Sequence, residues 1–148
     1  MADVSDQPVK APWHVWAVGG ASLLWNLVGA MDFVMTQTKN EAYMRDFTAA
    51  QLKFYYGFPV WVVAAWGIAV WGGVLGSLAV LVRKKLAVFL FLASFICMLL
   101  TSIHNFVFSN GFEVMGGAGS LIFSAVIIAI GALLLAYSRS MRNRGVLG

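Results

Sequence analysis

Four long uncharged segments dominate this sequence. None of them contains Asp, Glu, Lys or Arg, and they cover residues 11–31, 54–82, 86–112 and 114–138. Each exceeds the roughly 20 residues that an α-helix needs to cross about 30 Å of hydrocarbon. We therefore predict an all-α membrane protein with four transmembrane helices in a compact bundle, spanning about 13–35, 58–82, 86–108 and 116–137.

Composition indicates what surrounds these helices. Charged residues make up 11% of the chain and hydrophobic residues 61%, whereas a soluble domain has about 25% charged and about 45–50% apolar residues. The lipid bilayer is therefore the expected partner of most of the surface. The 148 residues are enough for one domain, residues 1–148, and leave almost no mass for a soluble one.

The distribution of basic residues predicts the orientation of the helices, because Lys and Arg near spans favour the cytoplasmic side. Four spans place both termini on one side. That side holds seven of the ten basic residues, namely Lys10, Arg83, Lys84, Lys85, Arg139, Arg142 and Arg144. The other side holds Lys39, Arg45 and Lys53. Both termini are expected in the cytoplasm, and the net charge of +4 is interpreted as anchoring to anionic lipid and not as nucleic-acid binding.

The polar segment between the first and second spans contains a local helix signal. Thr48 and Gln51 have the spacing of a capping box, in which each side chain bonds the free backbone amide of the other residue. This pair predicts a short interfacial helix between the first two spans.

Small residues on two spans predict close helix packing. Gly72 and Gly76 have the GxxxG spacing that lets helix backbones approach each other. The fourth span carries Gly117, Ser120 and Ser124. These residues indicate contacts inside the bundle or a seam between two copies of the chain.

Asp32 is the most informative polar residue. It lies near the end of the first span, where the helix dipole disfavours an anion and water is partly excluded, so it needs a partner. The candidate partners on the same side are Lys39, Arg45, Lys53 and His104. Asp32 is either a structural ion pair or loop tether, or a residue that contacts substrate or couples protons.

Five further residues are candidates for substrate binding or proton coupling: Asn26, Trp66, Trp71, His104 and Asn105. Asn26 and Asn105 are expected at about the depth of Asp32. His104 could relay a proton beside an acidic group, or it could be a hydrogen-bonding residue at a helix interface. Trp66 and Trp71 lie towards the middle of a span, where they could form an aromatic platform for a sugar-like or cationic ligand or simply pack between helices.

Several kinds of chemistry are disfavoured. The single cysteine, Cys97, cannot perform thiol–disulfide exchange, which needs a pair. His14 and His104 are expected on opposite membrane faces, which disfavours a haem bound by both. The sequence has no phosphate loop, zinc-ligand spacing or nucleophile elbow. We therefore expect no catalytic residues, no metal, no cofactor and no enzyme activity.

Four strings carry a resemblance to known proteins: Trp-Asn-Leu-Val-Gly-Ala-Met-Asp-Phe at 25–33, Asn-Glu-Ala-Tyr-Met at 40–44, Gly-Phe-Pro-Val-Trp at 57–61 and Met-Gly-Gly-Ala-Gly at 115–119. On these strings the chain resembles a family of small four-helix inner-membrane proteins from proteobacteria. The resemblance implies the bacterial inner membrane as the location. Some of the similar proteins are labelled sugar transporters.

Two functions are compatible with these features. The first is a transporter of a small polar, sugar-like solute that works as a homo-oligomer, because four helices are few for a pathway and a dimer would supply eight. The second is an accessory or scaffold subunit of a membrane complex that transports nothing. A carrier should depend on the charge of Asp32, whereas a scaffold should depend on the segment 40–53.

Overall fold

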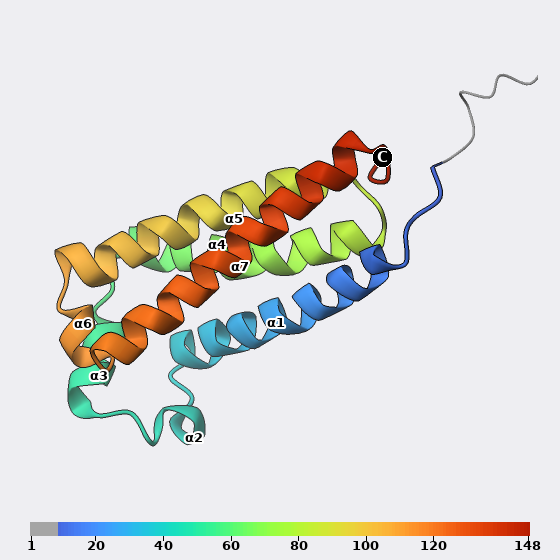
Figure 1. Cartoon of the computed structure of the whole chain (residues 1–148). Coiled ribbons are helices and arrows are strands. Elements are labelled where there is room, and N and C mark those ends of the chain that lie inside the picture. The colour runs from blue at the N-terminus through green and yellow to red at the C-terminus, as the bar shows by residue number, and fades with distance from the viewer. Residues whose placement is uncertain (1–8) are drawn as a thin grey trace, which may run out of the picture.

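Four long helices form the body of the protein. The computed structural model describes residues 9–148, so the first eight residues of the predicted domain lie outside the described part. Each long helix is long and apolar enough to cross a membrane, which confirms the predicted all-α class with four candidate spans. The helices are α1 (His14–Gln37), α4 (Val60–Leu81), α5 (Leu86–Ile103) and α7 (Ala118–Asn143), shown in Figure 1.

Three short helices and one π-helical turn connect the long helices. They are α2 (Glu41–Met44), α3 (Ala49–Tyr56), α6 (Gly111–Val114) and the π-helical turn His104–Phe108, which continues α5. At α3, Thr48 and Gln51 form both hydrogen bonds of a capping box, so the helix predicted from this pair is present. The sequence did not predict α2, α6 or the π-helical turn.

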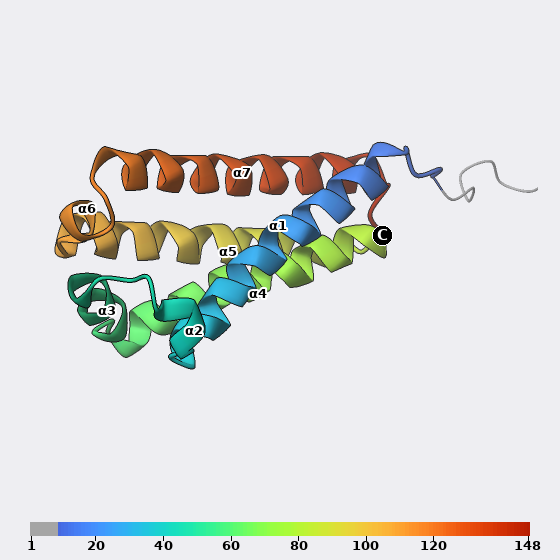
Figure 2. The ribbon, with the colours of Figure 1, turned by 90° about the horizontal axis from the view of Figure 1, so that it is seen from below.

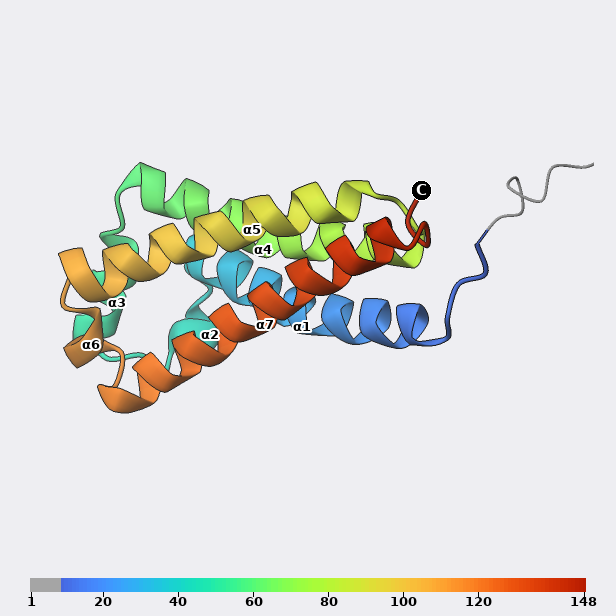
Figure 3. The same cartoon turned by 45° about the horizontal axis from the view of Figure 1, so that its top comes forward.

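Both described ends of the chain lie at one end of the molecule, together with the turn between α4 and α5 (Figure 1). We call this the terminal end, and the opposite end, which holds α2, α3 and α6, the loop end. Helix α4 packs between α1 and α5, and α7 packs on α5 (Figure 3). Helices α1 and α7 have little direct contact along most of their length.

Helix α1 runs obliquely to the others, so the bundle is tighter at one end than at the other. It crosses α4 and comes near α7 at the terminal end (Figure 2). There His14 Nδ1 lies 2.6 Å from the hydroxyl of Tyr137. The compact bundle expected from the sequence is therefore closed only at the terminal end, and α1 and α7 leave space between them towards the loop end.

Buried apolar side chains fill the terminal end. The last residues fold back over the α4–α5 turn, where the Gly148 amide donates a 2.9 Å hydrogen bond to the Arg83 carbonyl and the Lys85 amide donates a 3.0 Å bond to the Gly148 carbonyl. This places Leu147 in a core cluster whose other buried members are Val15, Ala79, Val80, Ala87, Phe91, Met141 and Val146.

Glycines on one face of α4 allow α5 to approach closely. Gly72 and Gly76 face α5: an added Cβ would lie 3.2 Å from the Ser94 Cβ at Gly72 and 2.8 Å from the Phe91 ring at Gly76. These two residues therefore serve packing within the chain. Gly117 differs from expectation, because it precedes α7 with φ +67° and a Cβ there would have only the Phe112 ring, at 4.0 Å, as a neighbour. It acts in the turn and not in helix packing.

The helix limits differ from the expected spans for local reasons. Helix α4 begins at Val60 because Pro59 occupies its N-cap position, where a missing amide hydrogen costs no helical bond. Helix α7 continues to Asn143, beyond the expected end at Tyr137. Its last turns carry Arg139 and Arg142, so the helix extends past its apolar part as a polar segment.

Candidate functional site

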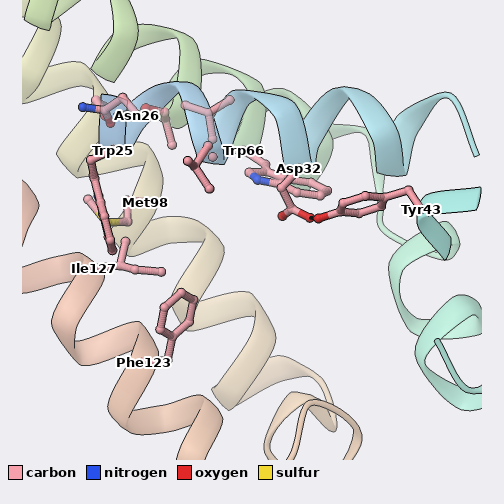
Figure 4. Close-up of a pocket in the computed structure, with 13 residues that line it drawn as sticks. Trp25, Asn26, Asp32, Tyr43, Trp66, Met98, Phe123 and Ile127 are labelled. Atoms are coloured by element: carbon pink, nitrogen blue, oxygen red, sulfur yellow. Dashed lines mark hydrogen bonds between the residues drawn. The ribbon is translucent and has the colours of Figure 1, made fainter. Parts of the chain in front are cut away.

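A cavity lies between α1, α4, α5 and α7, on the loop side of the core (Figure 4). It consists of two adjoining hollows of about 430 Å³ and about 510 Å³. Seven residues line both hollows, so we describe them as one cavity: Asp32, Trp66, Ala69, Val70, Met98, Phe123 and Ile127. Its volume is in the range of pockets that bind small molecules, about 300–1,000 Å³.

Most of the cavity wall is apolar. Trp25 of α1 and Trp66 of α4 provide aromatic surface, and Met98 comes from α5. Phe123 and Ile127 are four residues apart on α7, so they share one helical face. Figure 4 shows these side chains directed into the space between the helices.

Asp32 is held at the wall of this cavity by a phenol. The hydroxyl of Tyr43 donates a 2.5 Å hydrogen bond to Asp32 Oδ1. Tyr43 is positioned by α2, whose N-cap residue Asn40 accepts a 3.0 Å hydrogen bond from the Tyr43 amide through its side-chain oxygen. Asp32 therefore tethers the loop after α1, which is one of the two roles considered from the sequence. Its partner is a hydroxyl group and not a basic side chain.

Of the lysine and arginine residues expected to pair with Asp32, Lys39 and Arg45 have other neighbours and Lys53 is exposed. Arg45 Nε lies 3.9 Å from a carboxylate oxygen of Asp46, and both side chains are exposed. Lys39 Nζ lies 4.9 Å from the centre of the Tyr56 ring. Within residues 9–148, no ion pair joins Asp32 to a basic side chain.

The environment of Tyr43 favours its neutral form. Burial first, and then the hydrogen bond to Asp32, raise the pKa of Tyr43 to about 12. Burial also raises the pKa of Tyr55, which lines the larger hollow, and the charge of Asp32 adds to the effect. Tyr43 therefore remains a hydrogen-bond donor to Asp32 across the neutral pH range.

His104 lies behind the cavity and does not line it. The residue is buried, with its ring edge-on to Phe58 and Trp61, each at a centroid distance of 5.5 Å. Its Nδ1 lies 3.1 Å from the side-chain oxygen of Asn105. No hydrogen bond joins His104 to Asp32 in the described part of the chain, so this candidate pair is not formed and the two residues have separate partners.

Asn105 lines the larger hollow from the π-helical turn. An added Cβ at Gly111 would overlap the Asn105 carbonyl, so a glycine is needed where α6 meets this turn. Turns of this kind are frequent at functional sites because they redirect side chains relative to the preceding helix. Here the turn places Asn105 at the cavity and His104 behind it.

Asn26 lines the smaller hollow and also joins α1 to α4. Its side-chain nitrogen donates to the Ser22 carbonyl at 2.8 Å and to the Ser77 hydroxyl at 3.3 Å. Its amide group lies against Gly73, where an added Cβ would overlap it. Asn26 therefore has a structural role at the cavity floor.

The two central tryptophans differ in position. Trp66 lines both hollows, with its ring edge-on to Phe33 at 5.0 Å and to Phe58 at 6.1 Å. Trp71 is 43% exposed on the outside of the helices and does not line the cavity. Of the two, only Trp66 is placed to contact a ligand here.

Ser120 and Ser124 line the larger hollow from α7. The hydroxyl of Ser120 donates a 2.8 Å hydrogen bond to the Gly117 carbonyl. Together with Phe123 and Ile127 these serines form one face of α7 with helical spacing, a pattern that could have indicated a cavity-lining face. No such signal exists for Tyr43, because its contact with Asp32 depends on how α2 folds back on α1.

The groups that line the cavity are of a few kinds. Residues 9–148 contain no group of three or more metal-ligating side chains. The cavity wall has one carboxylate, seven hydroxyl groups, two side-chain amides and a large aromatic surface. The chain matches no known family model, no curated protein and no solved structure.

Proposed function

We propose that the protein is a multi-pass protein of the bacterial inner membrane with both chain ends in the cytoplasm. Large apolar side chains on the outside of the long helices support this proposal: Leu24 is 69% exposed, Ile122 65% and Leu133 68%. Contact of these apolar side chains with lipid has no hydrophobic cost, whereas their contact with water is unfavourable. The excess of basic residues at the terminal end supports a cytoplasmic position for that end.

Within this framework, the protein binds a small solute in the cavity and carries it across the membrane. The observation that supports this function best is the cavity itself, which holds the carboxylate of Asp32 between four candidate spans. The larger hollow extends to Tyr55 of α3 and Met115 beside α6, whereas the core cluster fills the terminal end. This asymmetry corresponds to a carrier open on the side opposite the termini.

A homo-oligomer is part of this proposal. No residue in the most apolar part of α7 is buried within the chain, so the outer face of this helix is free for lipid or for a second copy. A second copy would add walls to a cavity that four helices surround incompletely.

Access to water is the first test. In a Cys97→Ala background, Ser124→Cys places a thiol in the cavity, and Ile122→Cys places a matched thiol on the exposed outer surface of α7. N-ethylmaleimide should label Ser124→Cys faster, because a thiol surrounded by hydrocarbon does not ionise and does not react. Equal, slow labelling of both variants would show that the cavity is closed to water and would contradict a carrier.

Transport is the second test. Proteoliposomes containing the Ser124→Cys variant are assayed for uptake of a monosaccharide, an amino acid and an organic cation. A carrier should take up at least one of these compounds saturably, and labelling with N-ethylmaleimide should block the uptake. A labelled, water-filled cavity without uptake of any compound would favour the accessory subunit, whose docking surface would include the exposed charged residues Glu41, Arg45 and Asp46 near α2.

A further inference from the structure

Asp32 is an uncompensated charge on an otherwise uncharged wall. It is the only Asp, Glu, Lys or Arg among the residues that line the two hollows. One of its carboxylate oxygens accepts the Tyr43 hydrogen bond, and the other has no hydrogen bond from residues 9–148. Asp32 is half-buried, so a cation beside this carboxylate is attracted more strongly in the partly apolar surroundings of the wall than it would be in bulk water.

None of the nearby lysine and arginine side chains, Lys39, Arg45 and Lys53, forms an ion pair with Asp32. Lys39 lies over Tyr56, and Arg45 lies beside Asp46. The Tyr43 hydroxyl satisfies one lone pair of Asp32 but adds no positive charge. The second carboxylate oxygen of Asp32 is therefore available to a cationic ligand.

The remaining wall distinguishes between kinds of ligand. A metal ion such as Ca²⁺ requires about six to eight oxygen ligands, and this cavity has one carboxylate. A sugar requires many hydrogen-bond partners, and four of the seven hydroxyl groups in the wall already donate within the protein: Ser94 to Ala69, Thr101 to Cys97, Ser120 to Gly117 and Tyr43 to Asp32. Aromatic faces, in contrast, attract organic cations.

We propose that the cavity binds an organic cation, an amine or quaternary ammonium compound with apolar substituents. Its charged nitrogen lies beside the free oxygen of Asp32, and its apolar part contacts Trp25, Trp66 and Phe123. Hollows of about 430 Å³ and about 510 Å³ accommodate such a compound. This assignment rests on the proposed function, because it names the class of solute that the carrier would take.

Protection from labelling tests the assignment with defined probes. The protein with Cys97→Ala and Ser124→Cys, in uncharged detergent, reacts with N-ethylmaleimide in the presence of choline, of its neutral isostere 3,3-dimethylbutan-1-ol or of sodium chloride. Choline should slow the reaction saturably, and the other two compounds should not at equal concentration. The comparison isolates the charge of an organic cation from its shape and from ionic strength.

Two variants then identify the groups responsible. Asp32→Asn keeps the size of the side chain and its bond from Tyr43, and should raise the choline concentration needed for half-protection about tenfold or more. Trp25→Leu removes one aromatic face and should raise it by a factor of about two or more. Glu113→Gln, an exposed carboxylate in α6 at the same end, is the control and should change nothing.

The outcomes separate this assignment from the proposed function. If Ser124→Cys reacts but choline gives no protection, or if the neutral isostere or sodium chloride protects equally, the organic-cation assignment is wrong while the water-filled cavity stands. Protection that persists unchanged in both Asp32→Asn and Trp25→Leu also overturns the assignment. If Ser124→Cys does not react at all, the proposed function and the assignment fail together.

Discussion

The side chain of Asn26 on α1 occupies the space that a Cβ atom would take on Gly73 of α4. The same asparagine donates hydrogen bonds to Ser22 and Ser77, so it cannot move away without breaking them. Steric fit and hydrogen bonding therefore fix how α1 lies against α4, and this contact sets the position of the cavity wall that α1 provides.

Gly73→Ala should lower the melting temperature in detergent, because the added methyl group displaces the Asn26 amide. Overpacking of this kind typically costs about 1–3 kcal/mol. Combining Gly73→Ala with Asn26→Ala should recover part of the loss, since the methyl group then has space. Gly20→Ala is the control, because its Cβ would meet nothing within 4 Å, and it should melt at or above the parent temperature. A Gly73→Ala protein that melts like Gly20→Ala would contradict the close contact.

Tyr43 should ionise at unusually high pH. Its pKa is raised to about 12 by burial and by the hydrogen bond to Asp32, against about 10 in an unfolded chain. The difference in absorbance at 295 nm between the parent and Tyr43→Phe should therefore show a midpoint near pH 12. Asp32→Asn should lower this midpoint because it removes the charge of Asp32, while the contribution of burial remains. A parent midpoint already near 10 would show that Tyr43 is neither buried nor bonded to Asp32 in solution.

The same shift predicts an effect on stability in alkali. Because the folded state holds the Tyr43 proton more tightly than the unfolded state, the stabilisation is fully present below about pH 10. It is lost as the pH rises through the folded pKa of about 12. Between about pH 10 and about pH 12, the melting temperature of Tyr43→Phe should therefore fall less than that of the parent in the same detergent.

The sequence determined the features of the fold that depend on local or average properties. The lengths of the four uncharged segments alone predict the four long helices, because a chain inside hydrocarbon must satisfy every backbone polar group with hydrogen bonds of its own. The helix α3 was predicted from Thr48 and Gln51 because both groups of a capping box lie within one turn. The openness of the bundle towards the loop end was not predictable, since it depends on the angle at which α1 crosses α4.

The site was predicted less completely, for a geometric reason. His104 was a candidate partner of Asp32 because the two residues lie at similar depth, but depth does not fix the direction in which a side chain points around the bundle. His104 points to Phe58 and Trp61, and Asp32 points to Tyr43. The carboxylate of Asp32 was expected to pair with a basic side chain, but α2 places the phenol of Tyr43 next to it.

Topology gives a separate prediction. A reporter inserted between Asp46 and Phe47, in the exposed segment before α3, should be active only outside the cytoplasm. A reporter after Gly148 should be active inside, provided that a flexible linker precedes it, because Gly148 itself is hydrogen-bonded to the α4–α5 turn. The expected pattern follows from the seven-to-three distribution of basic residues. An external reporter signal at the C-terminus would reverse the orientation and place the cavity opening on the cytoplasmic side.

The closed terminal end gives the last prediction. Leu147 is 3% exposed within the core cluster, whereas Leu133 on α7 is 68% exposed. Leu147→Ala should cost about 2–5 kcal/mol, because it leaves a void among packed side chains. Leu133→Ala changes the same number of atoms at a surface and should melt near the parent temperature. Equal melting temperatures for the two variants would show that the tail is detached in solution and that the terminal end is open, and the access to the cavity would then no longer be restricted to the loop end.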